Sequence, residues 1–436
     1  MLLPDLVRHN GRWRGRHPAL VTARETLSWA ELASRVEHVA AGLAAAGLSG
    51  ERIAIVMENE AAAAEIILGA MLCGVTVVPL NLSIADSAID TLIRDADIAA
   101  IAVSGSQAAR ICPDALVSAR LLLCSGEEAG WVSFAGWRDA QDAEIAPPSP
   151  PPGSLCNIIY SSGTTGRPKG IAHTHQARID WTHDLAHALR YHSGARTLVT
   201  TGIYSNISWV SMLPTLMLGG TIHLHDGFDV SAILAELAEE RITHMAMVPV
   251  QLQRIVEHSA FDPRAFARLQ SVMCCGSPLA AGLKAGLIEL LPLAFFELYG
   301  STEGIITTLA PEDAAARLGS VGLPLPGERL AILGPDDMPL PPGEPGEIVA
   351  ASRFQMDGYW RRADATAEAR WVDPDGRTWL RSGDIGRLDA DGFLTITDRK
   401  KDMIISGGQN IYPADLEAAI LAHADVADCA VIGVPS

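Results

Sequence analysis

The sequence Tyr-Ser-Ser-Gly-Thr-Thr-Gly-Arg-Pro-Lys-Gly, residues 160–170, decides more about this chain than any other stretch. It combines glycines, hydroxyl residues and Lys169, the first lysine of the chain. A glycine-rich turn can aim several backbone N–H groups at one anion, and hydroxyls and a lysine add donors and positive charge. The apolar run 155–160 predicts a strand, so this phosphate loop is expected at a strand end, where open α/β sheets bind ligands. The pattern therefore predicts a polyphosphate site.

The spacing inside the loop argues against the Walker type of phosphate loop. A Walker loop has four residues between its first glycine and a Gly-Lys-Ser/Thr unit, whereas here Gly170 follows Lys169 directly. Pro168 also blocks the helix that a Walker loop would begin. A P-loop kinase or ATPase is therefore disfavoured, and a flexible linker stays open as the alternative for the loop taken alone.

Three later segments extend the pattern in a fixed order: Leu298–Gly304 (Leu-Tyr-Gly-Ser-Thr-Glu-Gly), Arg381–Gly386 (Arg-Ser-Gly-Asp-Ile-Gly), and Asp398–Lys401 followed by Ser406–Asn410. Each alone could be a turn or a solvated charge run. Together with the phosphate loop they resemble the acyl-adenylate-forming superfamily, which includes acyl-CoA and aryl-CoA synthetases, peptide-synthetase adenylation domains and luciferases. The resemblance covers nearly the whole chain and is strongest to an acyl-CoA or aryl-CoA ligase.

The resemblance implies roles for individual residues. Glu303 would hold Mg²⁺, a hard ion that prefers oxygen ligands, Thr302 would contact the α-phosphate, and Lys169 the other phosphates. Lys401 would lie at a hinge, and Gly408 would line the tunnel for the pantetheine of coenzyme A. The implied ATP-binding residues are Ser161, Ser162, Gly163, Thr164, Thr165, Gly166, Gly276, Ser277, Pro278, Tyr299, Gly300, Ser301, Thr302, Asp384 and Arg399. Lys169 could instead be a surface lysine beside the loop.

The reaction implied by the resemblance is that of an AMP-forming acid–thiol ligase using ATP, Mg²⁺ and coenzyme A. A carboxylate oxygen attacks the α-phosphorus of ATP and displaces pyrophosphate, and the thiol then displaces AMP from the acyl carbon. Such catalysis depends mostly on positioning and electrostatics. Two alternatives stay open: an enzyme that loads the phosphopantetheine of a carrier protein, and a nucleotide- or acyl-binding protein without turnover.

The acid should be selected by the segment Ile203–Trp209, called the acid segment below, with Tyr204, Ser205, Trp209 and Cys275 as the predicted pocket. Acyl-CoA synthetases often carry an aromatic-His pair near this position, and this segment has no histidine. It also has no aspartate for an amino group and no arginine for a second carboxylate. An apolar aryl, alicyclic or medium-chain acid is therefore expected, although Tyr204 and Trp209 could equally be core aromatics.

The alternation of apolar runs with helical stretches predicts an α/β fold with mostly parallel sheets. We expect a large N-terminal domain over 1–397, with two stacked αβ subdomains and a β-rich subdomain from about 319. Residues 398–436 would be the hinge and the start of a small α+β C-terminal domain. Such domains normally continue for about 100 residues and carry a second catalytic lysine, but no lysine follows Lys401. We therefore expect a piece of a longer protein, with natural shortening as the alternative.

Composition limits the class of protein. With 436 residues and a net charge of −18, the chain lacks the basic character that nucleic acid or an anionic membrane requires. Seven cysteines without regular spacing fit a reducing cytosol. The apolar run 61–80 contains Glu65 and predicts a buried helix and strand, not a membrane span. We expect a soluble, cytoplasmic enzyme and leave a homodimer open.

Two histidine pairs, His173 with His175 and His223 with His225, could each face a metal ion. Neither pair has an evident third ligand in the sequence. Solvated or core histidines are therefore the favoured interpretation.

Overall fold

The protein is described here by a computed structural model covering residues 1–436. The described residues exclude 144–148, 162–167, 240, 402–403, 407–408, 412, 414–415, 418–419, 421–422, 424–425, 427–428 and 433–436.

The first sheet contains the apolar runs of the N-terminal third of the chain and the two strands that flank the phosphate loop. Its strands are β3 Arg52–Val56, β4 Thr76–Pro79, β5 Ala100–Val103, β6 Leu121–Cys124, β7 Val132–Ser133, β8 Leu155–Ser161, β9 Lys169–Thr174 and β19 Gly358–Tyr359. Their order is β19-β9-β8-β4-β3-β5-β6-β7. The strands from β8 to β7 pair in parallel, whereas β9 is antiparallel to both β8 and β19. The central strands β4 and β5 are buried throughout, as parallel strands covered on both faces must be.

The second sheet follows the same principle. Its strands are β1 Pro18–Val21, β2 Thr26–Ser28, β10 Arg196–Val199, β11 Thr221–Leu224, β12 His244–Met247, β13 Ser271–Cys274, β14 Phe295–Ser301, β15 Ile305–Leu309 and β16 Leu323–Pro324. Their order is β16-β15-β14-β13-β12-β10-β11-β1-β2, with parallel pairing from β14 to β1. The hairpin of β14 and β15 is antiparallel and carries the segment 298–304.

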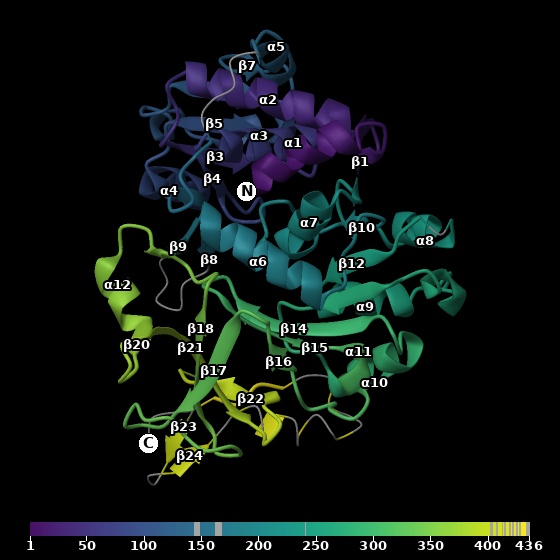
Figure 1. The fold of residues 1–436 in the computed structure, drawn as a ribbon, viewed down its shortest axis with the longest axis vertical. Coiled ribbons are helices and arrows are strands. Elements are labelled where there is room, and N and C mark those ends of the chain that lie inside the picture. Colours follow the sequence, from purple (N-terminus) through teal and green to yellow (C-terminus); the bar gives the residue numbers. More distant parts are fainter. Residues whose placement is uncertain are drawn as a thin grey trace.

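Helices fill the space between the two sheets and cover their outer faces. The helices are α1 Leu3–Trp13, α2 Trp29–Ala45, α3 Ala61–Leu72, α4 Asp86–Ala96, α5 Phe134–Asp139, α6 His175–Ala188, α7 Asn206–Leu218, α8 Val230–Ala238, α9 Pro249–Val256, α10 Ala281–Leu290, α11 Pro311–Ala314 and α12 Ala363–Glu368. One apolar core joins α1, α2, α3, α6 and α7 to both sheets, so these helices form a shared middle layer (Figure 1). A second core places α4 on the outer face of the first sheet, and a third places α8, α9 and α10 on the second. This arrangement confirms the predicted stacked αβ architecture.

A third sheet is antiparallel and lies after residue 327. Its strands are β17 Glu328–Leu333, β18 Gly346–Ser352, β20 Arg370–Val372, β21 Thr378–Leu388 and β22 Leu394–Arg399, in the order β17-β18-β21-β20 with β22 on β21. The hairpin of β23 Ile404–Ser406 and β24 Gln409–Ile411 follows it, in yellow at the bottom of Figure 1. Within the predicted β-rich region, β16 and β19 pair with the other two sheets. The domain boundary at 397/398 stays a prediction.

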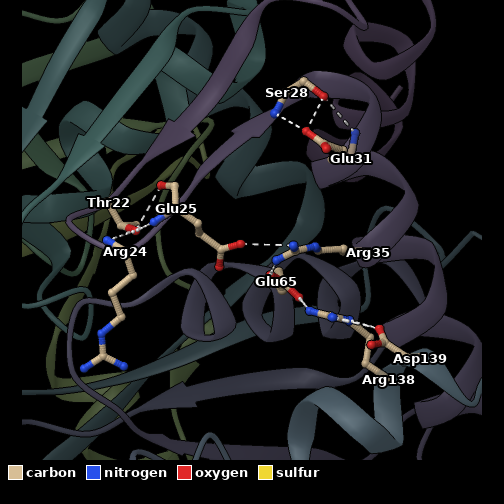
Figure 2. A network of polar contacts seen from close by, with 9 residues as sticks. All are labelled: Thr22, Arg24, Glu25, Ser28, Glu31, Arg35, Glu65, Arg138 and Asp139. Atoms are coloured by element: carbon tan, nitrogen blue, oxygen red, sulfur yellow. Dashed lines mark hydrogen bonds and ion pairs between the residues drawn. The ribbon is translucent and has the colours of Figure 1, made fainter.

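Buried charges connect the helices of the N-terminal subdomain. Glu65 of α3 is 1% exposed and accepts hydrogen bonds from Arg35 of α2 at 2.9 Å and from Arg138 of α5 at 2.7 Å (Figure 2). Ser28 and Glu31 form a capping box at the start of α2. The bonds from Arg35 and Arg138 explain how the apolar helix α3 accommodates the carboxylate of Glu65. Among the described helices, none is long and apolar enough to span a membrane.

Candidate active site

Asp384 lies at the centre of the first contact between motif segments. Its Oδ2 accepts a hydrogen bond of 2.7 Å from the Tyr299 hydroxyl, and its Oδ1 lies 3.4 Å from Nε of Arg399. Asp384 and Arg399 are also directly opposed in the pairing of β21 with β22. Burial raises the pKa of Asp384, while Tyr299 and Arg399 act in the opposite direction. Residues from the second and third sheets therefore converge on one carboxylate.

Glu303 and Lys169 are connected by Tyr359, which the sequence reasoning did not identify. The Tyr359 hydroxyl donates to Oε1 of Glu303 at 2.9 Å, and Nζ of Lys169 lies 4.8 Å from the centroid of the Tyr359 ring. Burial, and then the charge of Glu303, raise the pKa of Tyr359, so its hydroxyl remains a donor. A glutamate carboxylate such as that of Glu303 supplies the oxygen ligands that a divalent cation prefers.

The central residues of the phosphate loop, Ser162, Gly163, Thr164, Thr165 and Gly166, lie outside the described residues, as does Gly408. The two ends of the loop belong to the neighbouring strands β8 and β9. Ser161 and Lys169 face each other in the pairing of β8 with β9.

Tyr160, at the start of the loop, is attached to α4 and to the segment after β19. Its hydroxyl donates to Oδ2 of Asp95 at 2.7 Å, while Arg362 contacts Oδ1 of the same carboxylate at 2.5 Å. The backbone N–H of Trp360 donates to the carbonyl of Gly170 at 2.7 Å. The segment that follows β19 therefore anchors both ends of the phosphate loop.

The backbone carbonyl of Thr302 is bonded to a buried histidine, which contacts two further buried polar side chains. Nε2 of His173 donates to the Thr302 carbonyl at 2.8 Å, and Nδ1 of His173 accepts from Asn157 and from Arg178, each at 3.2 Å. Arg178 also donates to Oδ1 of Asn157 at 2.7 Å. Burial lowers the pKa of His173 well below its ordinary value, so the ring is neutral with its proton on Nε2. We call His173, Asn157 and Arg178 the buried histidine network.

Two glycines have backbone geometry that a side chain would disturb. A Cβ on Gly300 would lie 2.6 Å from the carbonyl oxygen of Ile305, across the hairpin of β14 and β15. Gly304 has a φ of 115°, and a Cβ there would lie 2.8 Å from Cα of Gln355. The turn with Ser301 and Glu303 therefore depends on glycine at both positions.

The acid segment meets the predicted ATP-binding residues at Gly276. Gly276 has a φ of 96°, and a Cβ there would lie 2.9 Å from Cδ1 of Ile207. The sequence Gly276–Pro278, including Ser277, forms an exposed loop after β13. Because Ile207 belongs to the acid segment, the structure brings the predicted acyl and adenosine regions together.

The other predicted pocket residues have different environments. Ser205 caps α7 by accepting from the N–H of Ile207, and Tyr204 is half-buried. Cys275 is buried, and burial raises the pKa of its thiol to about 12. Trp209 has no exposed surface and donates through Nε1 to the carbonyl of Ile203 at 2.8 Å. The pocket assignment of these residues stays a prediction.

Asn59, also missed from the sequence, fixes the start of the acid segment. Its Oδ1 accepts from the N–H of Ile203 at 2.7 Å, and its Nδ2 donates to the carbonyls of Thr201 and His225 at 3.1 and 2.9 Å. Asn59 follows β3 of the first sheet, whereas Ile203 follows β10 of the second. The acid segment is therefore attached to both sheets.

The histidines of the second pair share an acidic partner. Glu236 lies 3.1 Å from Nδ1 of His223 and 3.2 Å from Nε2 of His225. Burial would raise the pKa of Glu236, but the two histidines beside it lower it to about 2. His175 is buried, which lowers its pKa to about 4. No group of three or more candidate metal ligands occurs among the described residues.

Lys401, the predicted hinge residue, is exposed in the turn after β22.

Stacked α/β sheets with a glycine-rich loop at a strand end and a Tyr–Asp–Arg cluster nearby define a nucleotide-dependent enzyme. The family model described as AMP-binding enzyme matches residues 7–360. The chain therefore belongs to the AMP-binding enzyme family.

Relatives and solved structures agree with this assignment. A feruloyl-CoA synthase from Amycolatopsis sp is 37% identical, over 94% of this chain and 81% of the relative. An indoleacetate–CoA ligase from Aromatoleum aromaticum is 31% identical, over 98% and 84%. The o-succinylbenzoate CoA synthetase of Bacillus subtilis, in complex with its acyl-adenylate intermediate, is 26% identical with a TM-score of 0.86, over 99% and 86%. The chain is an adenylate-forming enzyme of the carboxylate–CoA ligase type, as its motifs predicted.

Proposed function

We propose that this protein uses MgATP to activate an aryl carboxylic acid and transfers the acyl group to coenzyme A. Apart from its carboxylate, the body of this acid would be uncharged and apolar. The observation that supports this proposal best is a continuous series of contacts through the four motif segments. It runs from Lys169 through Tyr359 to Glu303, along β14 to Tyr299, and on to Asp384 and Arg399. Groups suited to the phosphates, to a metal ion bound by the phosphates and to the ribose thus follow one another as these parts do in MgATP.

The proposed roles follow from the chemistry of these groups. Asp384 accepts from both ribose hydroxyls while Tyr299 and Arg399 hold its carboxylate in place. Lys169 and the phosphate loop bind the β- and γ-phosphates, and Thr302 contacts the α-phosphate. Glu303 supplies an oxygen ligand to Mg²⁺, which when bound neutralises charge on the departing pyrophosphate. The acid then needs only to be positioned in line with the α-phosphorus.

The preference for an uncharged body rests on the acid segment. None of its residues carries a charge, and Cys275 beside it is a buried, neutral thiol. A second carboxylate in such surroundings would lose its hydration without gaining a partner. The relatives named for ferulate and indoleacetate are consistent with an aryl body.

The cellular setting is part of the same proposal. The chain has seven cysteines without regular spacing, a usage that suits a reducing cytoplasm. A homodimer stays open, to be tested by light scattering.

The test is mass spectrometry of the protein incubated with MgATP, coenzyme A and a pool of ferulic, indoleacetic, 2-succinylbenzoic, malonic and medium-chain fatty acids. We expect an acyl-AMP or acyl-CoA mass for a monocarboxylic aryl acid. A product from malonate or from a fatty acid alone would overturn the proposed substrate class. Nucleotide binding without any product would favour the binding protein without turnover.

A matched pair of variants tests the ribose assignment. Asp384→Ala should weaken ATP binding by roughly 10- to 150-fold, because hydrogen bonds to a charged group contribute about 1.5–3 kcal/mol. Asp389→Ala, directly after β21 and paired with Arg317 away from the motif residues, should bind ATP like the unmodified protein. Equal ATP affinities of the two variants in calorimetry would contradict the assignment.

A further inference from the structure

Tyr359 occupies a position between two functional groups that come from different sheets. Its hydroxyl donates to Glu303 on the hairpin of the second sheet, and its ring supports the Lys169 ammonium of the first. A phenol is one of few side chains that can do both, because its edge carries a donor and its face attracts a cation. Neither contact alone would require a tyrosine.

The backbone around Tyr359 is fixed to both strands. Tyr359 pairs with Ile171 in the first sheet, and the neighbouring N–H of Trp360 donates to the Gly170 carbonyl. Three residues earlier, the N–H of Met356 donates to the carbonyl of Glu303 at 2.8 Å. The segment 356–360 therefore joins the strand that carries Lys169 to the turn that carries Glu303.

The backbone of Tyr359 is fixed from the other side by α12. The N–H of Tyr359 donates to Oγ1 of Thr366 at 2.9 Å, and that hydroxyl donates to the carbonyl of Arg362 at 2.9 Å. These bonds hold the main chain of Tyr359 in one conformation. With the side chain placed by its own contacts to Glu303 and Lys169, less entropy is lost in ordering these two groups when a ligand binds.

We propose that Tyr359 is a positioning residue for adenylation, orienting the metal-binding carboxylate of Glu303 through its hydroxyl and the phosphate-binding ammonium of Lys169 through its ring. The inference rests on the proposed function, since it assumes Mg²⁺ at Glu303 and phosphates at Lys169. The hydrogen bond from the tyrosine to Oε1 of Glu303 holds the carboxylate in one orientation, in which Oε2 would be the oxygen offered to the cation. Groups that orient a metal ligand in this way typically change metal affinity by about 10- to 100-fold.

Two substitutions separate the two contacts. Tyr359→Phe removes the hydroxyl and keeps the ring, so Mn²⁺ binding to the ATP complex, measured by electron paramagnetic resonance, should weaken by about 10-fold or more. Its affinity for ATP without metal should be unchanged. Tyr359→Leu also removes the ring, and metal-free ATP binding should weaken by a further ~2- to 5-fold, as expected for a lost cation–π contact.

A double-mutant cycle and a control variant distinguish this role from a structural one. In a Glu303→Gln background, Tyr359→Phe should cause no further loss of Mn²⁺ affinity, because its effect acts through that carboxylate. Tyr191→Phe, a buried tyrosine whose ring contacts His244, should leave Mn²⁺ and ATP binding unchanged.

Three results would overturn the inference. These are unchanged Mn²⁺ affinity in Tyr359→Phe, the same loss in Tyr191→Phe, and additive losses in the cycle. If the unmodified protein bound neither ATP nor Mn²⁺, the proposed function itself would fail first, and this inference with it.

Discussion

Replacing His173 with leucine should destabilise the protein strongly, although the two side chains have similar volumes. The variant loses the hydrogen bond to the Thr302 carbonyl and the acceptor shared by Asn157 and Arg178. Each of the two bonds between neutral groups contributes about 1 kcal/mol, and the bond from the charged Arg178 contributes more. The free energy of unfolding should therefore fall by roughly 3–6 kcal/mol. At roughly 2 °C per kcal/mol, the melting temperature should fall by about 6 °C or more.

The assay is scanning calorimetry at neutral pH, with intrinsic fluorescence as a second probe. Trp181 and Trp209 lie 4.8 and 5.2 Å from the Arg178 guanidinium, measured to their ring centroids, so both report on the buried histidine network. Their emission should change in the folded variant before any unfolding occurs.

His175→Leu is the matched control. His175 is 3% exposed, two residues further along the chain, and its Nε2 has no hydrogen-bond partner among the described residues. Its replacement should cost no more than about 1 kcal/mol. If the two variants melt within about 2 °C of each other, the energetic importance assigned to the buried histidine network is wrong.

Two further predictions concern charges in the core. Burial lowers the pKa of His175 from 6.5 to about 4. Between these two pH values, the unfolded chain therefore binds a proton at His175 and the folded protein does not. Stability should therefore fall by about 3 kcal/mol at this site as pH drops from 6.5 to 4, and His175→Leu should have a flatter profile in urea unfolding; an identical profile would contradict the assignment. Glu65→Ala should cost about 3–5 kcal/mol because it leaves Arg35 and Arg138 without their shared carboxylate. Glu37→Ala, which breaks a half-exposed pair with Arg8, should cost under about 1 kcal/mol, and equal losses in urea unfolding would show that the burial of Glu65 has no energetic weight.

Much of the fold could be predicted from local patterns. The apolar run 155–160 is strand β8, and the run 61–80 is helix α3 followed by strand β4, because uninterrupted apolar segments suit elements that are buried on both faces. The family resemblance supplied the motif residues, four of which the structure connects through Tyr359 and Asp384.

Residues that act through distant contacts could not be predicted in this way. Tyr359 belongs to a strand of two residues whose partner, β9, precedes it by more than 180 positions, so no periodicity marks it. His173 was expected to be a solvated or core histidine, but its partners became visible only when β8, β9 and α6 were packed together. Asn59 likewise gave no signal, because its bonds are to backbone groups in another sheet.

The arrangement of the motif residues has a consequence for how the protein becomes active during synthesis. Lys169 belongs to the first sheet, Glu303 to the turn of a hairpin in the second, and Asp384 with Arg399 to the third. Domains generally fold as units in order of their emergence from the ribosome. A nascent chain can thus have both αβ layers folded while Asp384, the proposed ribose ligand, is still being translated. Nucleotide binding should be acquired only after residue 399 has emerged, so ATP cannot assist the folding of the layers that will later hold it.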